Sequence, residues 1–109
     1  MKMYWYPACG ACRKARAHFA RQGIEPELIN LATDPPTIDQ LRTLWTASGL
    51  PLRKFFNTSG QSWRNGDFSG RLPTMDHDAQ LAALAADGML IKRPIIVDGD
   101  RVSVGFKGE

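Results

Sequence analysis

The residues of this sequence best suited to chemistry are two cysteines, Cys9 and Cys12, which form one C-x-x-C motif. Cys9 follows Pro7 and directly precedes a run of strong helix formers. A cysteine in this place meets the unpaired N–H groups and the positive dipole end of the helix, and both stabilise a thiolate. Arg13, four residues further on, adds a positive charge on the same side of the helix. We therefore predict a reactive thiolate at Cys9.

The second cysteine points to a division of roles within the pair. Cys12 lies one turn into the predicted helix, so it is better shielded than Cys9 and near enough to attack a mixed disulfide there. We expect Cys9 to attack and Cys12 to resolve, which gives a reversible Cys9–Cys12 disulfide. Two alternatives stay open: half-buried structural thiols, or a zinc site completed by His18 and His77. Both histidines are more typical of surface helix positions, so we predict no metal and no bound cofactor.

The composition is that of an ordinary globular domain. The chain has 109 residues, of which 43% are hydrophobic and 23% charged, and this predicts one domain over residues 1–109. Fourteen Lys and Arg against eleven Asp and Glu give a net charge of +3, a modest excess that indicates an anionic partner. The sequence has no basic stripe with interleaved aromatic residues, so we expect no direct binding of nucleic acid. The apolar runs are too short to span a membrane. We expect no signal peptide, no membrane anchor and a cytoplasmic protein.

A strand, a helix and a second strand are predicted to position the cysteines. The aromatic, β-prone segment 2–6 predicts the first strand. Segment 10–22 predicts an amphipathic helix that ends at Gly23, and segment 27–31 predicts the second strand. A right-handed crossover makes two such strands parallel. The C-x-x-C motif then lies at the carboxyl end of the first strand.

Helices and a hairpin are predicted to follow this unit. Thr37 and Gln40 have the spacing of a capping box, at the start of a helix that ends at Gly49. Segment 76–87 is rich in Ala and Leu and predicts another helix. A D-G turn between two β-prone runs predicts a hairpin over residues 94–106.

The chain between these elements is harder to assign. Residues 52–56 predict a short helical turn, and residues 57–73, rich in Gly, Ser and Asn, predict mostly loop with one short helix. The order β-α-β, then helices, then a β-hairpin is typical of a thioredoxin-like domain. We therefore predict an α/β fold with a thioredoxin-like mixed sheet and an inserted helical subdomain at about residues 36–88.

Four segments in this order resemble the glutaredoxin-like arsenate reductase (ArsC) family, specifically its Spx/MgsR-like branch. They are YPACGACRKAR at residues 6–16, PPT at 35–37, FFNTSG at 55–60 and LIKRPIIV at 90–97. The resemblance covers essentially the whole chain. It implies a thioredoxin-like sheet with an inserted helical part, and a cis peptide bond between Arg93 and Pro94 that faces the cysteine.

The resemblance also implies an anion site. Arsenate reductases of this family use one nucleophilic cysteine and three arginines that hold the oxyanion, which places these roles on Cys9 and Arg93. Guanidinium groups suit this task because they neutralise an oxyanion with two parallel hydrogen bonds. The candidate residues for binding an anion or substrate are Arg13, Arg93, Asn57 and Lys107.

The sequence departs from the family pattern at three places. Asn57 and Lys107 stand where the family has its other two arginines. Arg53 and Arg64 are nearby candidates to replace a missing guanidinium. Cys12 has no counterpart in typical arsenate reductases. Because of these departures, the predicted activity depends on the C-x-x-C pair and not on a three-arginine oxyanion site.

Two functions follow. The first is a thiol–disulfide oxidoreductase that reduces a small oxyanion such as arsenate, or a disulfide, and is restored by an external thiol reductant such as glutathione, glutaredoxin or thioredoxin. The alternative is an Spx-like redox-sensing transcriptional regulator that binds RNA polymerase through its α subunit. We favour the oxidoreductase because the chain ends at Glu109, without the longer extension that the resemblance implies for the regulators.

Overall fold

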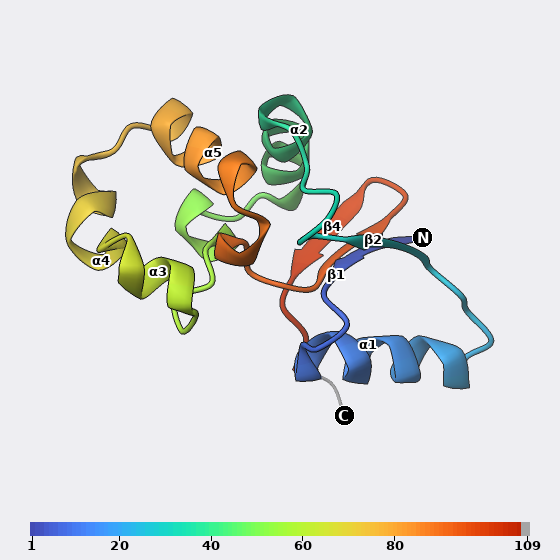
Figure 1. Ribbon diagram of the computed structural model, residues 1–109. Coiled ribbons are helices and arrows are strands. Elements are labelled where there is room, and N and C mark those ends of the chain that lie inside the picture. The colour runs from blue at the N-terminus through green and yellow to red at the C-terminus, as the bar shows by residue number, and fades with distance from the viewer. Residues whose placement is uncertain (108–109) are drawn as a thin grey trace.

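A computed structural model describes residues 1–107 and contains one four-stranded mixed sheet (Figure 1). The strand order is β2-β1-β3-β4. Strand β1 pairs parallel with β2 and antiparallel with β3, and β3 pairs antiparallel with β4. The strands are β1 (Lys2–Trp5), β2 (Glu27–Asn30), β3 (Ile95–Asp98) and β4 (Arg101–Val104). The predicted α/β fold, a βαβ unit followed by a hairpin, is confirmed.

The helices divide between the two faces of this sheet (Figure 1). Helix α1 (Gly10–Arg21) covers one face, and α2 (Ile38–Ser48) and α5 (His77–Ala86) cover the other. Short helices continue away from the sheet between α2 and β3: η1 (Leu52–Phe55), α3 (Gln61–Asn65), α4 (Phe68–Arg71), η2 (Leu72–Thr74) and η3 (Gly88–Leu90). Within residues 1–107, no helix is long and apolar enough to cross a membrane.

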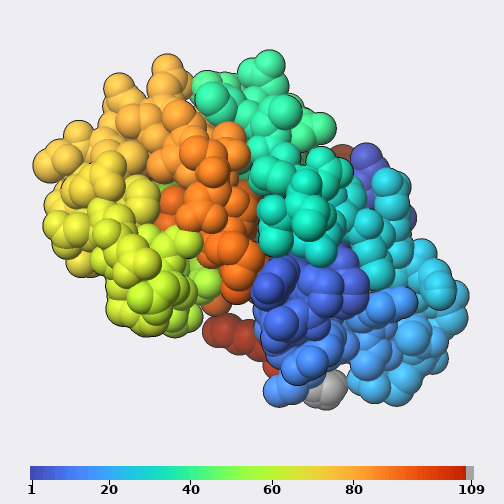
Figure 2. Space-filling view, viewed as in Figure 1, coloured from blue at the N-terminus to red at the C-terminus, as the bar shows by residue number. Residues whose placement is uncertain are grey.

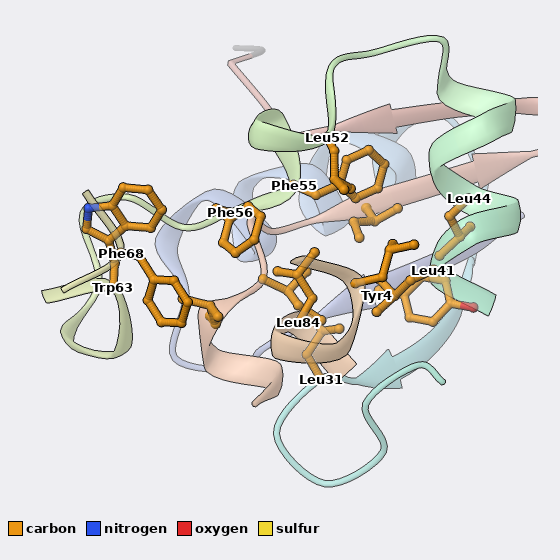
Figure 3. Packing of buried hydrophobic residues seen from close by; sticks show 14 of the residues in the cluster. Tyr4, Leu31, Leu41, Leu44, Leu52, Phe55, Phe56, Trp63, Phe68 and Leu84 are labelled. Atoms are coloured by element: carbon orange, nitrogen blue, oxygen red, sulfur yellow. The ribbon is translucent and has the colours of Figure 1, made fainter. Parts of the chain in front are cut away.

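Alternation along the strands supplies both faces with apolar side chains. In β1, Met3 packs with Ala15 of α1 and Ile96 of β3. The next residue, Tyr4, joins the larger cluster under α2 and α5 (Figure 3). That cluster includes Leu31, Leu41, Leu44, Leu52, Phe55, Phe56, Trp63, Phe68, Leu72, Leu81, Leu84, Leu90, Ile91 and Ile95. The sheet therefore separates two apolar layers of different size.

Helix α2 begins and ends as its sequence predicts. The Gln40 N–H donates to the Thr37 hydroxyl at 3.1 Å, and the Thr37 N–H donates to the Gln40 side-chain oxygen at 2.9 Å. These reciprocal bonds satisfy N–H groups that have no partner inside the helix. Gly49 follows the last turn with a left-handed φ of 67°. The capping box therefore fixes the start of α2 through bonds within its own first turn.

The segment 57–73 differs from its prediction of mostly loop. It contains α3, α4 and the start of η2. The rings of Trp63 and Phe68 are 6.0 Å apart, and both rings contact Phe56 at 5.8 and 6.0 Å. Burial of these aromatic side chains outweighs the low helix propensity of the intervening glycines.

Close packing fixes the path from η3 into β3. A side-chain carbon at Gly88 would overlap the carbonyl oxygen of Leu31, just after β2. Only glycine lets the two backbones approach this closely. From η3 the chain runs through Arg93 and Pro94 into β3, and the peptide bond between these two residues is cis.

Candidate active site

Cys9 lies at the junction of β1 and α1, as the N-cap residue of the helix. Its backbone is extended, with φ −81° and ψ 120°, and its sulfur accepts a hydrogen bond from the Cys12 N–H at 3.3 Å. The Cys9 N–H donates to the Tyr6 carbonyl at 3.0 Å, which closes the turn around Pro7. The partly exposed sulfur thus occupies the place where a capping oxygen would normally accept this bond. The sulfur therefore lies at the positive end of the helix dipole.

Cys12 has the opposite environment. Its side chain is fully buried, whereas Cys9 is half-buried, and both residues are free thiols. Burial raises the pKa of Cys12 to about 12, and a hydrogen bond with Cys9 acts in the same direction. The Tyr6 backbone and the Arg93 charge act in the opposite direction but are weaker. The pair therefore consists of one accessible sulfur and one sulfur held as a protonated thiol.

Arg93 is held by its surroundings on several sides. One of its terminal nitrogens, Nη1, donates to the carbonyl oxygens of Met89 at 3.2 Å and Ile91 at 3.3 Å. The guanidinium lies 5.5 Å from the centre of the Tyr6 ring, within the range of a cation–π contact. The Arg93 Nε is buried and has no hydrogen-bond partner in the part of the chain that the structure describes. Arg93 is thus oriented by the turn before β3 and lies close enough to act electrostatically on Cys12.

A cleft of about 600 Å³ opens beside the first turn of α1. Its walls come from Ala11 of α1, from η1, from the turn before β3 and from the chain that follows β4. In the space-filling view, a hollow separates the yellow-green residues that lead into α3 from the blue residues at the start of α1 (Figure 2). The cleft is lined by Ala11, Leu50, Arg53, Lys54, Phe56, Thr58, Lys92, Arg93, Val104, Gly105, Phe106 and Lys107.

The structure brings together some of the predicted anion-binding residues but not all of them. Arg93 and Lys107 both line the cleft. Asn57 is not among the lining residues, and its side-chain oxygen accepts a hydrogen bond from the Ser59 hydroxyl at 3.3 Å. Arg13 is exposed on α1 and, like Cys9, is absent from the lining, which reaches α1 at Ala11, between the two cysteines. The cleft thus includes two of the four candidates, Arg93 and Lys107, and the anion-binding roles of Arg13 and Asn57 stay predictions.

Of the two candidate replacements for a missing arginine, only one reaches the cleft. Arg53 lines it, with its guanidinium 5.3 Å from the centre of the Trp63 ring. Arg64 instead donates to the Ser59 carbonyl at 3.2 Å and to the Gln61 side chain at 2.9 Å. These local bonds hold the Arg64 side chain against α3.

Two lysines of the cleft, Lys54 and Lys92, were missed by the sequence reasoning. Each is the neighbour of a candidate arginine, and the pairs at residues 53–54 and 92–93 are two of the three adjacent basic pairs in the chain, the third being at 13–14. Tertiary folding places both pairs on one cleft. The sequence signal that could have indicated these lysines is the pairing of basic residues in two separated turns.

The histidines of the zinc alternative lie in aromatic surroundings. The His18 ring is 5.3 Å from the Phe19 ring and 5.4 Å from the Phe106 ring, and the His77 ring is 4.7 Å from Trp45. Among residues 1–107, no group of three or more His, Cys, Asp or Glu side chains could hold a metal ion.

A sheet with this strand order and a C-x-x-C pair at the start of its first helix defines the class of thioredoxin-like proteins. Within that class the chain belongs to the ArsC family, whose family model matches residues 4–109. A solved ArsC family related protein from Bacteroides fragilis has a TM-score of 0.93 and 42% identity, with 98% of this chain and 92% of that chain covered. The resemblance inferred from the four sequence segments is confirmed.

Further relatives differ in the functions that their names give. Protein YusI of Bacillus subtilis is 49% identical over 107 residues, which cover 98% of this chain and 91% of YusI. An arsenate reductase of Rhizobium meliloti is 30% identical over 98 residues, with 87% of this chain and 66% of the relative covered. The regulatory protein MgsR of Bacillus subtilis is 24% identical over 106 residues, with 97% and 82% covered. The family thus includes proteins named as enzymes and proteins named as regulators.

Proposed function

We propose that this protein is a thiol–disulfide oxidoreductase in which Cys9 is the nucleophile and Cys12 the resolving thiol. The observation that carries this proposal is the contrast between the two sulfurs of one helical turn. The Cys9 sulfur caps α1 and is partly exposed, while the Cys12 thiol is fully buried and its pKa is raised to about 12. One sulfur can meet a substrate, and the other is protected until the first has reacted.

The reaction proceeds in two exchanges. The Cys9 thiolate attacks one sulfur of a disulfide, the substrate S–S bond breaks, and one substrate thiolate leaves. The Cys12 thiol then loses its proton, which the second leaving group can accept, and its sulfur attacks the Cys9 sulfur. The substrate leaves as a second thiol and the Cys9–Cys12 disulfide remains. Two electrons pass to the substrate, and an external thiol reductant, such as glutathione or a dithiol protein of the glutaredoxin or thioredoxin kind, returns them.

The basic residues favour a disulfide over arsenate as the substrate. Only Arg93 occupies one of the three arginine positions of the family, and its Nη1 donates to two backbone carbonyls. Asn57 lies outside the cleft, and Lys107 offers a point charge rather than a planar fork. Reduction of arsenate remains the second reaction to assay, because relatives of this chain are named arsenate reductases.

The test compares cysteine variants in a disulfide reduction assay. We expect Cys9→Ser to abolish turnover of a small disulfide such as oxidised 2-mercaptoethanol. Cys12→Ser should stop after one exchange and retain the substrate half on Cys9, visible as added mass in intact-protein mass spectrometry. Ala17→Ser, which adds a hydroxyl at an exposed position of the same helix, serves as the matched control and should behave as the unmodified protein. Turnover by Cys9→Ser would overturn the proposal.

A second candidate function is redox-dependent binding to the α subunit of RNA polymerase. It is supported by similarity to MgsR and to a global transcriptional regulator Spx of Streptococcus pyogenes, which is 24% identical over 95% of this chain. A Cys9–Cys12 disulfide would change the first turn of α1 and with it any surface that this turn presents. Binding of the oxidised and reduced protein to purified α subunit tests this candidate. Equal or absent binding in both states would remove it.

A further inference from the structure

The cleft beside α1 has an unusual balance of charge. Five basic side chains line it: Arg53, Lys54, Lys92, Arg93 and Lys107. Among residues 1–107, none of those that line the cleft is acidic. The chain segments that flank the cleft also lack negatively charged side chains, because residues 1–24 and residues 40–66 contain no Asp or Glu. Like charges gathered in a concave site focus a positive potential, which raises the local concentration of anions.

The volume of the cleft is too large for a single oxyanion. A tetrahedral oxyanion has five heavy atoms, and at ~30 Å³ for each, the share of one water in the liquid, it fills about 150 Å³. The cleft measures about 600 Å³. Three quarters of the space would stay open to water, which weakens the electrostatic hold of each cation. A larger ligand with several negative charges matches the site better.

Apolar side chains between the basic ones restrict the class of ligand further. Leu50, Phe56, Val104 and Phe106 contribute to the same lining, and all but Phe56 are only partly buried. A ligand that covers them must carry apolar groups beside its anionic ones. It must also bring a reducible sulfur to Cys9, which nucleic acids and phospholipids do not contain. A polypeptide with acidic and apolar side chains around a cysteine meets all three requirements.

We propose that the cleft binds an acidic, partly apolar peptide segment of a protein that carries a disulfide, and delivers that disulfide to Cys9. This inference rests on the proposed oxidoreductase function and names its substrate class. The Cys9 thiolate breaks the S–S bond of the segment and forms a mixed disulfide, and one cysteine of the substrate leaves as thiolate. Cys12 then transfers its proton to the remaining substrate sulfur and forms the Cys9–Cys12 disulfide, so the two electrons come from the protein's own dithiol.

The experiment uses three symmetric disulfides of one peptide length, each with a central cysteine and two leucines. Flanking positions are glutamate in the first peptide, glutamine in the second and lysine in the third. We expect kcat/KM for the glutamate peptide to exceed that for the glutamine peptide by about 10-fold or more at low salt. The lysine peptide should react most slowly. The preference should shrink as ionic strength rises, because the charges become screened.

Charge reversal in the cleft provides the structural control. The double variant Lys54→Glu and Lys92→Glu should lose the preference for the glutamate peptide or invert it. Arg21→Glu, an exposed change at the far end of α1, alters the charge without touching the cleft and should keep the preference. Equal kcat/KM values for the three peptides, or loss of the preference in Arg21→Glu as well, would overturn the inference.

A binding measurement separates this inference from the function on which it rests. Fluorescence anisotropy of the same peptides with serine in place of cysteine reports docking without chemistry. Tight docking of the glutamate peptide with no turnover of any disulfide would contradict the oxidoreductase and retain the acidic docking site. Turnover of oxidised 2-mercaptoethanol, with no selective docking of the glutamate peptide, would contradict the docking site and retain the oxidoreductase.

Discussion

The two faces of the sheet differ in how much apolar surface they bury. Under α2, α5 and the short helices, fifteen buried side chains form one cluster. Beneath α1, three buried side chains, Met3, Ala15 and Ile96, form the other, with partly buried neighbours such as Phe19 and Phe106. Both cysteines belong to the side with the smaller cluster. The difference teaches that the helix-rich face buries most of the apolar surface, while the proposed redox pair lies on the side with the thin layer under α1.

This separation suits a redox site. Closing a disulfide between Cys9 and Cys12 must alter the first turn of α1, where the Cys12 N–H now donates to the Cys9 sulfur. A helix held by few buried side chains can adjust at low cost. The large cluster lies on the opposite face, so we expect the fold to survive the proposed cycle of oxidation and reduction. Four substitutions or conditions probe this contrast.

The largest loss of stability is expected from a cavity in the large cluster. Leu84 of α5 is fully buried, so Leu84→Ala should lower the free energy of unfolding by about 3 kcal/mol or more. Urea denaturation followed by circular dichroism measures this loss. In the fraction that stays folded, the rate of Cys9 alkylation should be unchanged, because Leu84 lies on the opposite face of the sheet. A changed alkylation rate would show that packing on the large face affects Cys9 on the other face.

A smaller loss is expected on the α1 side. Phe19 is only partly buried, against Phe106 and His18, so Phe19→Ala should cost about 2 kcal/mol, roughly half of a fully buried Phe. The same urea titration gives the value. If Phe19→Ala destabilised the protein more than Leu84→Ala, the α1 layer would be the stronger of the two, and the comparison would have to be reversed.

The buried thiol makes the α1 side sensitive to alkaline pH. An unfolded thiol has a pKa of about 8.5, and folding raises the pKa of Cys12 to about 12. The folded state therefore holds this proton more tightly. The resulting stability is complete below about pH 8.5 and is lost as pH rises toward 12.

Under reducing conditions, the protein should lose about 1 kcal/mol more between pH 9 and pH 10 than Cys12→Ala does. Parallel urea titrations at several pH values compare the two. Identical pH dependence in both proteins would indicate that Cys12 does not couple to folding.

The smallest effect is expected from an ion pair on the surface of the large face. Arg42 of α2 and Asp78 of α5 approach to 3.0 Å, with 46% and 81% of their side chains exposed. Water screens such a pair, so Asp78→Asn should change the free energy of unfolding by less than about 0.5 kcal/mol. A loss above about 1 kcal/mol would mean that charge, and not the buried cluster, holds α2 against α5.

The elements with strong local signals could be predicted from the sequence. Thr37 and Gln40 start α2 through bonds that involve only their own turn, and the D-G turn joins β3 to β4 through local geometry. The N-terminal position of Cys9 on α1 follows from Pro7 and the helix formers after it. In each case the physical cause lies within a few residues of the chain.

The parts that the sequence could not predict depend on contacts between distant segments. Helices α3 and α4 form because Trp63 and Phe68 pack on Phe56, and no local propensity reveals that packing. The basic cleft likewise assembles from η1, the turn before β3 and the chain after β4. Arg13, predicted on the same side of the helix as Cys9, is exposed on α1, and its anion-binding role stays a prediction.

The contact between Gly88 and the Leu31 carbonyl has a consequence for mutational tolerance. Because any side-chain carbon at position 88 would overlap that oxygen, a library randomised at this codon and selected for folding should return glycine alone. Exposed Ala17, in contrast, should accept most residue types. Position 88 thus offers an internal standard for deep mutational scanning: depletion of its variants marks the level at which folding fails, and variants at Cys9 or Arg93 can be judged against it.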